Sequence, residues 1–115
     1  MICPNKNVKK AVVDCMKGGK GPLAITNILQ EGEFCGKGRL FTHSVLKPGV
    51  SIGTHPHHDE FEVYYILSGE GSYDDNGQIK TVHAGDVTVC PSGEVHGLEN
   101  TGTEDLAIIA LILYV

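Results

Sequence analysis

The chain has 115 residues, with nine lysines and arginines against fourteen aspartates and glutamates, for a formal net charge of −5. This length fits one domain with a modest core, so pairing with a second copy would add stability. No basic block is present, which argues against nucleic acid as a partner. No apolar segment approaches the roughly 20 residues of a membrane-spanning helix, so we expect no membrane partner either.

Glycine is the strongest compositional signal, at 15 of the 115 residues, about twice its usual share of roughly 7%. These glycines are scattered rather than repeated, which predicts many tight turns between short strands. We therefore expect an all-β fold, and the sequence shows no amphipathic helix of ordinary length.

The first half of the chain predicts five strands. Residues 1–22 are weakly patterned, and we expect them to form a flanking strand of a barrel or part of a dimer, with one β-barrel domain over residues 23–115. Glycine-rich turns are expected at 18–22 and 32–38. The strand at 61–67 is the clearest, because it is rich in aromatic and β-branched residues. The expected strands are 8–14, 23–29, 39–47, 51–57 and 61–67.

The second half begins with a hairpin at Asn76-Gly77, the dipeptide that best tolerates a type I′ turn. It joins strands expected at 71–73 and 78–82. Three more strands are expected at 87–90, 95–99 and 106–115. The last is almost wholly apolar, which is typical of a strand buried on both faces. Its second apolar face could be buried equally well in the core of the barrel or against a partner subunit. Together with the small core, this leads us to expect a homodimer.

The four cysteines, Cys3, Cys15, Cys35 and Cys90, form no Cys-x-x-Cys pair. A disulfide framework needs a secretory context, and the first residues lack the apolar stretch of a signal peptide. We therefore expect reduced thiols in a cytoplasmic protein. We expect the cysteines to serve as small, buried hydrophobic side chains rather than as catalytic residues.

A group of histidines carries the chemistry. His55 and His57 lie two apart in an expected strand, so their side chains share a face. Glu62 begins the next strand, and His96 follows a Pro-Ser-Gly turn much later. Three nitrogens and one carboxylate oxygen are ligands that Mn, Fe, Ni and Zn accept. On ligand type and spacing alone, an exposed His-x-His pair without a metal is as good an explanation of the pattern as a metal site.

Two longer patterns surround these residues. Residues 49–69 read Gly-(five)-His-Pro-His-(four)-Glu-(six)-Gly, and residues 85–100 read Gly-(five)-Pro-Ser-Gly-(two)-His-(three)-Asn. They resemble the two conserved motifs of the cupin superfamily, and the spacer of fifteen residues between Gly69 and Gly85 resembles that of small bacterial cupins. The resemblance implies a double-stranded β-helix, or jelly-roll-like small barrel, of six to eight strands. It implies one metal held by His55, His57, Glu62 and His96, with Asn100 fixing a turn.

Other polar residues near the motifs have different expected roles. Glu60 is a second carboxylate near His57, but Glu62 holds the position that the family pattern expects. His58 points away from His57, and we expect it and His83 to be exposed. His43 and Arg39 lie on the same face of the expected strand 39–47. If that face points inward, His43 would line the pocket. Tyr64 and His43 are our candidate partners for proton transfer.

Three function classes remain open. Four protein ligands leave about two open positions on an octahedral ion, and one carboxylate against a 2+ ion leaves a positive centre that favours an anionic ligand. The first class is a metalloenzyme, a dioxygenase, decarboxylase, lyase or isomerase acting on a small organic acid or sugar derivative. The second is a binding or sensing module without turnover. A purely structural metal is least expected, because such sites are closed. Mn or Fe is the favoured ion, with Ni and Zn as alternatives.

Overall fold

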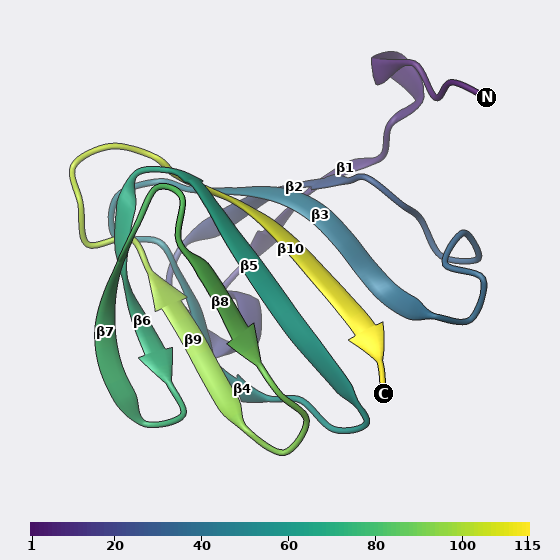
Figure 1. The fold of residues 1–115 in the computed structure, drawn as a ribbon. Helices are drawn as coiled ribbons and strands as arrows, with labels where there is room; N and C mark the ends of the chain where they lie inside the picture. Colours follow the sequence, from purple (N-terminus) through teal and green to yellow (C-terminus); the bar gives the residue numbers. More distant parts are fainter.

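The computed structural model describes residues 1–115, which fold into ten β-strands in two antiparallel sheets (Figure 1). The only helical segments are two turns of 3-10 helix, η1 (Asn5–Asn7) and η2 (Met16–Gly18). Neither is remotely long or apolar enough to cross a membrane. The all-β fold expected from the sequence is confirmed.

The larger sheet has six strands in the order β1-β2-β3-β10-β5-β8. The long strands β3, β10 and β5 lie side by side at its centre, joined by antiparallel pairing that shifts register once in each ladder. The strand bounds are β1 (Lys10–Asp14), β2 (Pro22–Asn27), β3 (Gly38–Leu46), β10 (Leu106–Tyr114), β5 (Glu60–Ser68) and β8 (Val87–Cys90).

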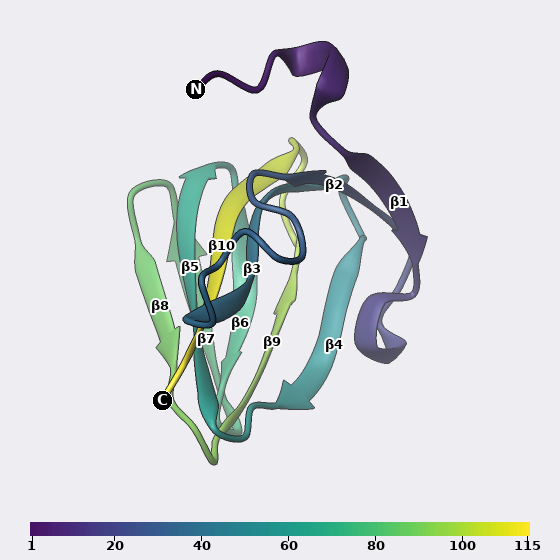
Figure 2. The same cartoon turned by 90° about the vertical axis from the view of Figure 1, so that its right-hand side faces the viewer.

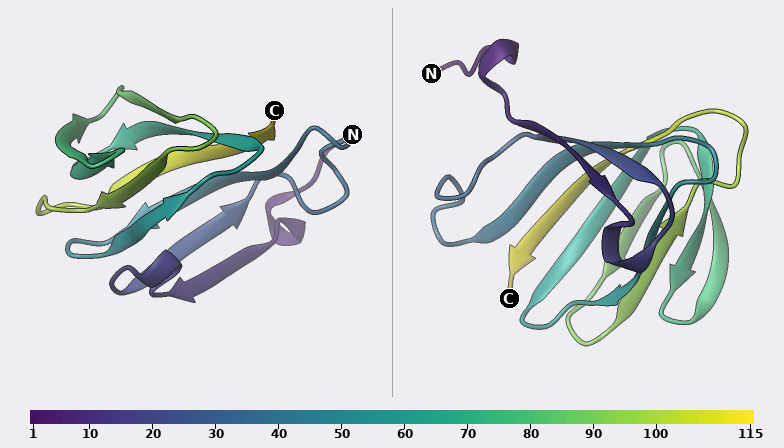
Figure 3. Two further views of the ribbon diagram at one scale, coloured as in Figure 1. Left: turned by 90° about the horizontal axis from the view of Figure 1, so that it is seen from below. Right: turned by 180° about the vertical axis from the view of Figure 1, so that it is seen from behind.

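The smaller sheet has four strands in the order β4-β9-β6-β7. Its bounds are β4 (Ser51–Pro56), β9 (Val95–Glu99), β6 (Glu70–Asp75) and β7 (Gln78–His83). The two sheets face each other across one interior (Figures 2 and 3), and buried side chains from both contribute to a single hydrophobic core. The fold therefore has an inside, bounded by the inner faces of the two sheets, in which a site can lie.

Ten strands form where ten were expected, with small shifts at their ends. The strand expected over 23–29 ends at Asn27, and the one over 51–57 ends at Pro56. This second difference arises because the chain turns between β4 and β5 through Asp59, which has a φ of 59°. The strand expected over 71–73 is longer, since β6 pairs with β7 over six residues. The count exceeds the six to eight strands that the resemblance implied.

The N-terminal residues lie at the margin of the barrel. β1 pairs with β2 from Lys10 opposite Thr26 to Asp14 opposite Pro22, which makes it the edge strand of the larger sheet. Residues 1–7 extend away from the barrel (Figures 1 and 2). After β1, η2 packs against β4, so residues 10–21 cover one side of the interior.

β10 has two apolar faces of different burial. Leu106, Ile108, Ala110 and Ile112 are at most 4% exposed and lie in the core. The alternate residues of β10, from Ala107 to Leu113, are only half-buried. Because alternate side chains of a strand point to opposite faces, the outer face of the larger sheet is apolar at its centre.

Asn100 fixes the loop that leads from β9 into β10. Its side-chain amide donates hydrogen bonds to the backbone oxygens of Leu46 and Glu104, both at 2.8 Å. Its side-chain oxygen accepts a hydrogen bond from the Gly102 N–H at 2.9 Å. The residue is 1% exposed, so it serves as the buried turn anchor that the motif predicts.

Candidate metal centre

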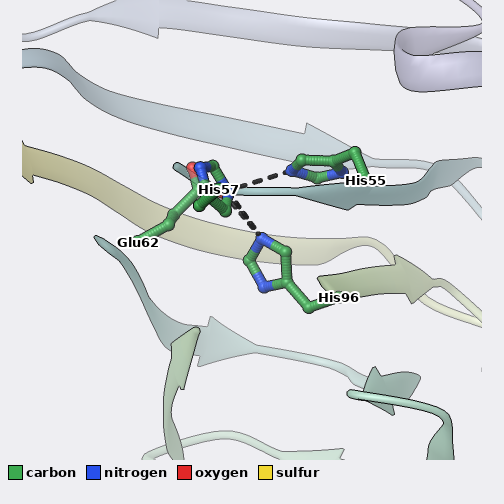
Figure 4. A group of neighbouring side chains, drawn as sticks. All are labelled: His55, His57, Glu62 and His96. Atoms are coloured by element: carbon green, nitrogen blue, oxygen red, sulfur yellow. Dashed lines mark hydrogen bonds and ion pairs between the residues drawn. The ribbon is translucent and has the colours of Figure 1, made fainter. Parts of the chain in front are cut away.

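Four side chains converge inside the barrel from three strands (Figure 4). His55 lies near the end of β4, His57 directly follows that strand, Glu62 lies on β5 and His96 on β9. All four are buried, and one potential ligand atom from each lies within 4.8 Å of the others. The structure thus brings together the four residues named from the sequence.

The converging atoms are three imidazole Nε2 nitrogens and one carboxylate oxygen. Glu62 Oε1 lies 2.8 Å from His96 Nε2, 2.9 Å from His57 Nε2 and 3.5 Å from His55 Nε2. The Nε2 atoms of His57 and His96 are 3.1 Å apart. Two ligand atoms that each lie about 2.1 Å from one ion, at right angles to each other, are separated by about 3.0 Å. The spacing therefore suits ligands that share one ion.

The other nitrogen of each ring already has a partner. His55 Nδ1 lies 2.7 Å from the Gly53 backbone oxygen, and His57 Nδ1 lies 2.6 Å from Glu60 Oε2. His96 Nδ1 lies 2.8 Å from the Tyr73 hydroxyl. A carbonyl and a carboxylate accept only, so these partners place the protons of His55 and His57 on Nδ1. Their Nε2 lone pairs then face the centre.

The charge state of the cluster also suits a cation. Burial raises the pKa of Glu62, but the adjacent imidazoles of His55, His96 and His57 outweigh it and lower that pKa to about 2. Burial lowers the pKa of His96, which favours its neutral form. A carboxylate and neutral imidazole nitrogens facing one point repel one another without a cation between them. We conclude that these residues fit one metal ion.

Glu60 holds His57 in place rather than competing with Glu62. It is 8% exposed and forms two hydrogen bonds of 2.7 Å with the Arg39 guanidinium, in addition to its contact with His57 Nδ1. Hydrogen bonds from Arg39 lower the Glu60 pKa to about 2. A carboxylate behind a ligating histidine fixes the ring and raises its basicity. The sequence reasoning set Glu60 aside as a ligand and missed this role.

Two tyrosines flank His96 on its two sides. The Tyr64 ring stacks on the His96 ring with centroids 4.8 Å apart and an interplanar angle of 20°. Tyr73 contacts His96 through the hydroxyl described above, and its ring lies edge-on at 83°. Burial raises the pKa of both hydroxyls, so both stay neutral. Tyr73 was missed from the sequence, where nothing distinguishes it from an ordinary strand tyrosine.

The other histidines lie away from the centre. His58 and His83 are exposed, as expected. His43 pairs with Ile109 across the β3–β10 ladder, on the face opposite to Thr42 and Ser44, which are buried and line the interior. Since His43 points outward, it does not line the cavity. Tyr64, the other candidate for proton transfer, does line it.

A cavity of about 280 Å³ opens beside the cluster. His55, His57 and Glu62 line one end of it, together with Tyr64. Its remaining walls come from the inner faces of β1, β2, β3 and β10, with Ile52 of β4 and Met16 of η2 opposite them. A small molecule in this cavity would therefore lie directly against the converging ligand atoms.

Comparison with known proteins gives three findings. The sequence model described as the cupin domain matches residues 42–112. The chain is 42% identical over 113 residues to a Thermotoga maritima protein named oxalate-binding protein, covering 98% of this chain and 93% of that relative. A Thermotoga maritima crystal structure described as a predicted oxalate decarboxylase superposes with a TM-score of 0.93 at 41% identity, over the full length of both chains.

More distant structures share the fold alone. KdgF from Halomonas sp. superposes with a TM-score of 0.76 at 15% identity, covering 97% of this chain and 91% of that one. The family model spans more than half of the chain, and the Thermotoga relative spans nearly all of it. With its two histidine motifs and its barrel of two antiparallel sheets, the chain belongs to the cupin family.

Proposed function

We propose that this cupin binds one divalent transition-metal ion through His55, His57, Glu62 and His96, and uses open positions on that ion to bind a small carboxylate anion. The observation that carries the proposal is the arrangement of ring nitrogens. Three Nε2 atoms meet Glu62 Oε1 at one point, while each Nδ1 is engaged elsewhere. Mn or Fe is favoured and Ni or Zn also suits the donor set.

The charges around the centre support an anionic ligand. Glu62 supplies one negative charge against two on the ion, and the charge of Glu60 is offset by Arg39 at 2.7 Å. The centre is therefore left with about one positive charge in a barrel that largely excludes water, where electrostatic attraction is strong. The name of the Thermotoga relative, oxalate-binding protein, supports a small carboxylate as the class of ligand.

The chain's own residues orient the ion's ligands and close the site. Gly53, Glu60 and Tyr73 hold the three imidazole rings, and the walls of the cavity are mostly apolar. When bound, the metal supplies a Lewis acid that polarises a carboxylate or carbonyl oxygen. Besides the metal ligands, the cavity wall holds no carboxyl group or histidine. This favours binding over a reaction that needs a general base.

Catalysis remains the second candidate because Tyr64 lines the cavity. Its phenol keeps its proton, since burial raises its pKa well above the usual value, and so it can donate a hydrogen bond to a bound anion. A decarboxylase or lyase acting on a small organic acid would use this hydrogen bond to stabilise developing negative charge. Release of carbon dioxide or another product from oxalate by the metal-loaded wild type, but not by Tyr64→Phe, would favour the enzyme.

Elemental analysis and calorimetry test the proposal. We expect about one transition-metal ion per chain in the wild type, and loss of most of it in His57→Ala and Glu62→Ala. His58→Ala, next in the chain but exposed, is the matched control and should retain the metal. Oxalate should bind the metal-loaded protein and not the metal-free protein. Equal metal content in the wild type and both ligand variants would contradict the proposal.

We also propose that two copies pair through the outer face of the larger sheet. Six apolar side chains lie together there, with β10 at the centre: Phe41, Val63, Tyr65, Val89, Ile109 and Leu111. Tyr65 and Val89 are 44% and 52% exposed, and an apolar patch of this extent is typical of an interface. One self-complementary patch on a central strand suits a twofold dimer.

Light scattering at micromolar concentration tests this pairing. We expect the mass of a dimer for the wild type and of a monomer for Ile109→Lys. Ile79→Lys is the control, because Ile79 is 70% exposed on β7 of the other sheet and should remain dimeric. A monomeric wild type would overturn the proposed pairing without bearing on the metal site.

A further inference from the structure

The cavity beside the metal centre is larger than a metal-bound oxalate requires. Its volume of about 280 Å³ is near the lower limit of the roughly 300–1,000 Å³ that is usual for sites of small organic molecules. The metal ligands lie at one end only. A two-carbon dianion chelated to an ion at that end would leave most of the cavity unfilled.

The strand register shows what lies beyond the metal end. On the inner face of the larger sheet, Glu62 is opposite Ile112, which is opposite Leu40. In the next row, Tyr64 is opposite Ala110, which is opposite Thr42. The small side chain of Ala110, between larger neighbours, contributes space in the middle of the sheet. The cavity therefore continues from Glu62 over Ala110 toward β2.

The far end of the cavity is mostly apolar. Leu23, Ile25, Leu40 and Ile108 form its wall on the larger sheet, with the Asn27 amide among them, and Ile52 and Met16 also line the cavity. The two hydroxyls in this region, those of Thr42 and Ser44, are 3.3 Å apart and pair with each other. A space lined in this way holds water poorly, so an apolar group that enters it gains by burial.

No buried, unpaired cation lines the cavity to receive a second charge. Arg39 is already held by both oxygens of Glu60 at 2.7 Å. Lys17, the other cation of the wall, is exposed and therefore keeps its hydration. A carboxylate placed at the far end would lose its hydration without gaining a partner, which is costly.

We propose that the preferred ligand is an α-keto or α-hydroxy monocarboxylate, whose two oxygens bind the metal and whose branched aliphatic tail fills the apolar end over Ala110. This inference rests on the proposed function, because the metal must hold the polar head. It adds a prediction of specificity to that function. The inner faces of β2, β3 and β10 should select a ligand with an uncharged tail of several carbons.

Calorimetry on the metal-loaded wild type tests the inference with matched acids. Pyruvate has the head without the tail, ketoisocaproate adds a branched apolar tail, and α-ketoglutarate adds a tail of similar length that ends in a charge. Each buried methylene strengthens binding roughly fourfold, so ketoisocaproate should bind at least about tenfold more tightly than pyruvate. It should exceed α-ketoglutarate by a similar factor.

Two variants place the effect at the far end of the cavity. Ala110→Leu fills the middle of the cavity and should abolish the preference for ketoisocaproate while keeping the metal. Ile25→Thr, which shortens the side chain and adds a hydroxyl to the apolar wall, should reduce the preference severalfold. It provides a second test if Ala110→Leu fails to fold. Circular dichroism and metal content would show whether each variant retains the wild-type structure.

The outcomes separate this inference from the proposed function. Equal affinities for pyruvate and ketoisocaproate, or tighter binding of α-ketoglutarate, would overturn the apolar tail. Binding of oxalate alone would overturn it as well, and would leave the proposed function standing. If neither oxalate nor any of the three keto acids binds the metal-loaded protein, both proposals fail.

Discussion

The two ends of the cavity differ in how their residues are held. At the metal end, His55, His57 and His96 each have a hydrogen-bond partner at 2.6–2.8 Å behind the ring. At the far end, residues such as Ile25 and Ile108 are held by packing alone. Hydrogen bonds fix directions, whereas apolar contacts are largely non-directional and tolerate changes of similar volume.

This difference implies a division of roles within one barrel. At the metal end, each histidine ring is fixed by a hydrogen-bond partner of its own, so the geometry of the centre and its ion should be insensitive to what lies at the far end. The far end determines which molecule fits beside the ion. Substitutions at one end should therefore change metal affinity, and substitutions at the other should change ligand preference alone.

The largest effect is expected for a substitution of the metal end itself. Glu62→Gln keeps the size of the side chain but removes the only negative charge among the four ligands. We expect metal affinity to fall more than about hundredfold, since a carboxylate is replaced by a much weaker neutral donor. Competition with a chelator of known affinity measures the change. Ile25→Thr at the far end should bind the metal like the wild type, and a comparable loss there would contradict the division.

A smaller effect is expected behind the ligands. Glu60→Gln weakens the hydrogen bond to His57 Nδ1 and the pair with Arg39. Loss of such a partner costs about 10–100-fold in metal affinity. Glu70→Gln is the matched control, because Glu70 is an exposed carboxylate on β6. The same chelator competition applies, and an unchanged affinity for Glu60→Gln would show that this pair does not support the metal.

Tyr73→Phe should have a weaker effect again. It removes the hydroxyl 2.8 Å from His96 Nδ1 and leaves the ring in place. A single neutral hydrogen bond contributes about 0.5–1.5 kcal/mol, which corresponds to a reduction in metal affinity of roughly two- to tenfold. Isothermal titration of the metal would detect it. A loss as large as that of Glu62→Gln would mean that Tyr73 has a further role.

The smallest effect concerns a thiol near the metal end. Cys90 pairs with Glu62 in the β5–β8 ladder, is 2% exposed, and has a pKa that burial raises to about 11. Cys3, Cys15 and Cys35 are exposed. With a thiol reagent at pH 8, three of the four thiols should react rapidly and Cys90 only on unfolding. Four rapid reactions would show that this part of the barrel opens readily.

The comparison also explains how far the sequence could predict the site. The four converging residues follow from the resemblance of the two motifs to those of cupins, since spacing alone places only His55 and His57 on one face. Arg39 could not be found in this way, because it reaches Glu60 across 21 residues and from another strand. The orientation of His43 was undecidable, since its strand carries apolar residues on both faces and only the register with β10 shows which face is inside.

The fold was easier to predict than the cavity. Glycine-punctuated strands and the Asn-Gly hairpin predict an all-β barrel from local chemistry alone. The cavity instead depends on which side chains of β2, β3 and β10 meet across the sheet, and on the small size of Ala110 among them. Those contacts are long-range, so no local pattern reveals them.

The central claim is that three Nε2 atoms and one carboxylate oxygen hold a metal ion. Anomalous diffraction from crystals of the metal-loaded protein, measured at the absorption edge of the bound element, tests it most directly. We expect one strong peak within bonding distance of Nε2 of His55, His57 and His96 and of Glu62 Oε1. A peak bonded to other residues, or none at this position in protein shown to contain the metal, would contradict it.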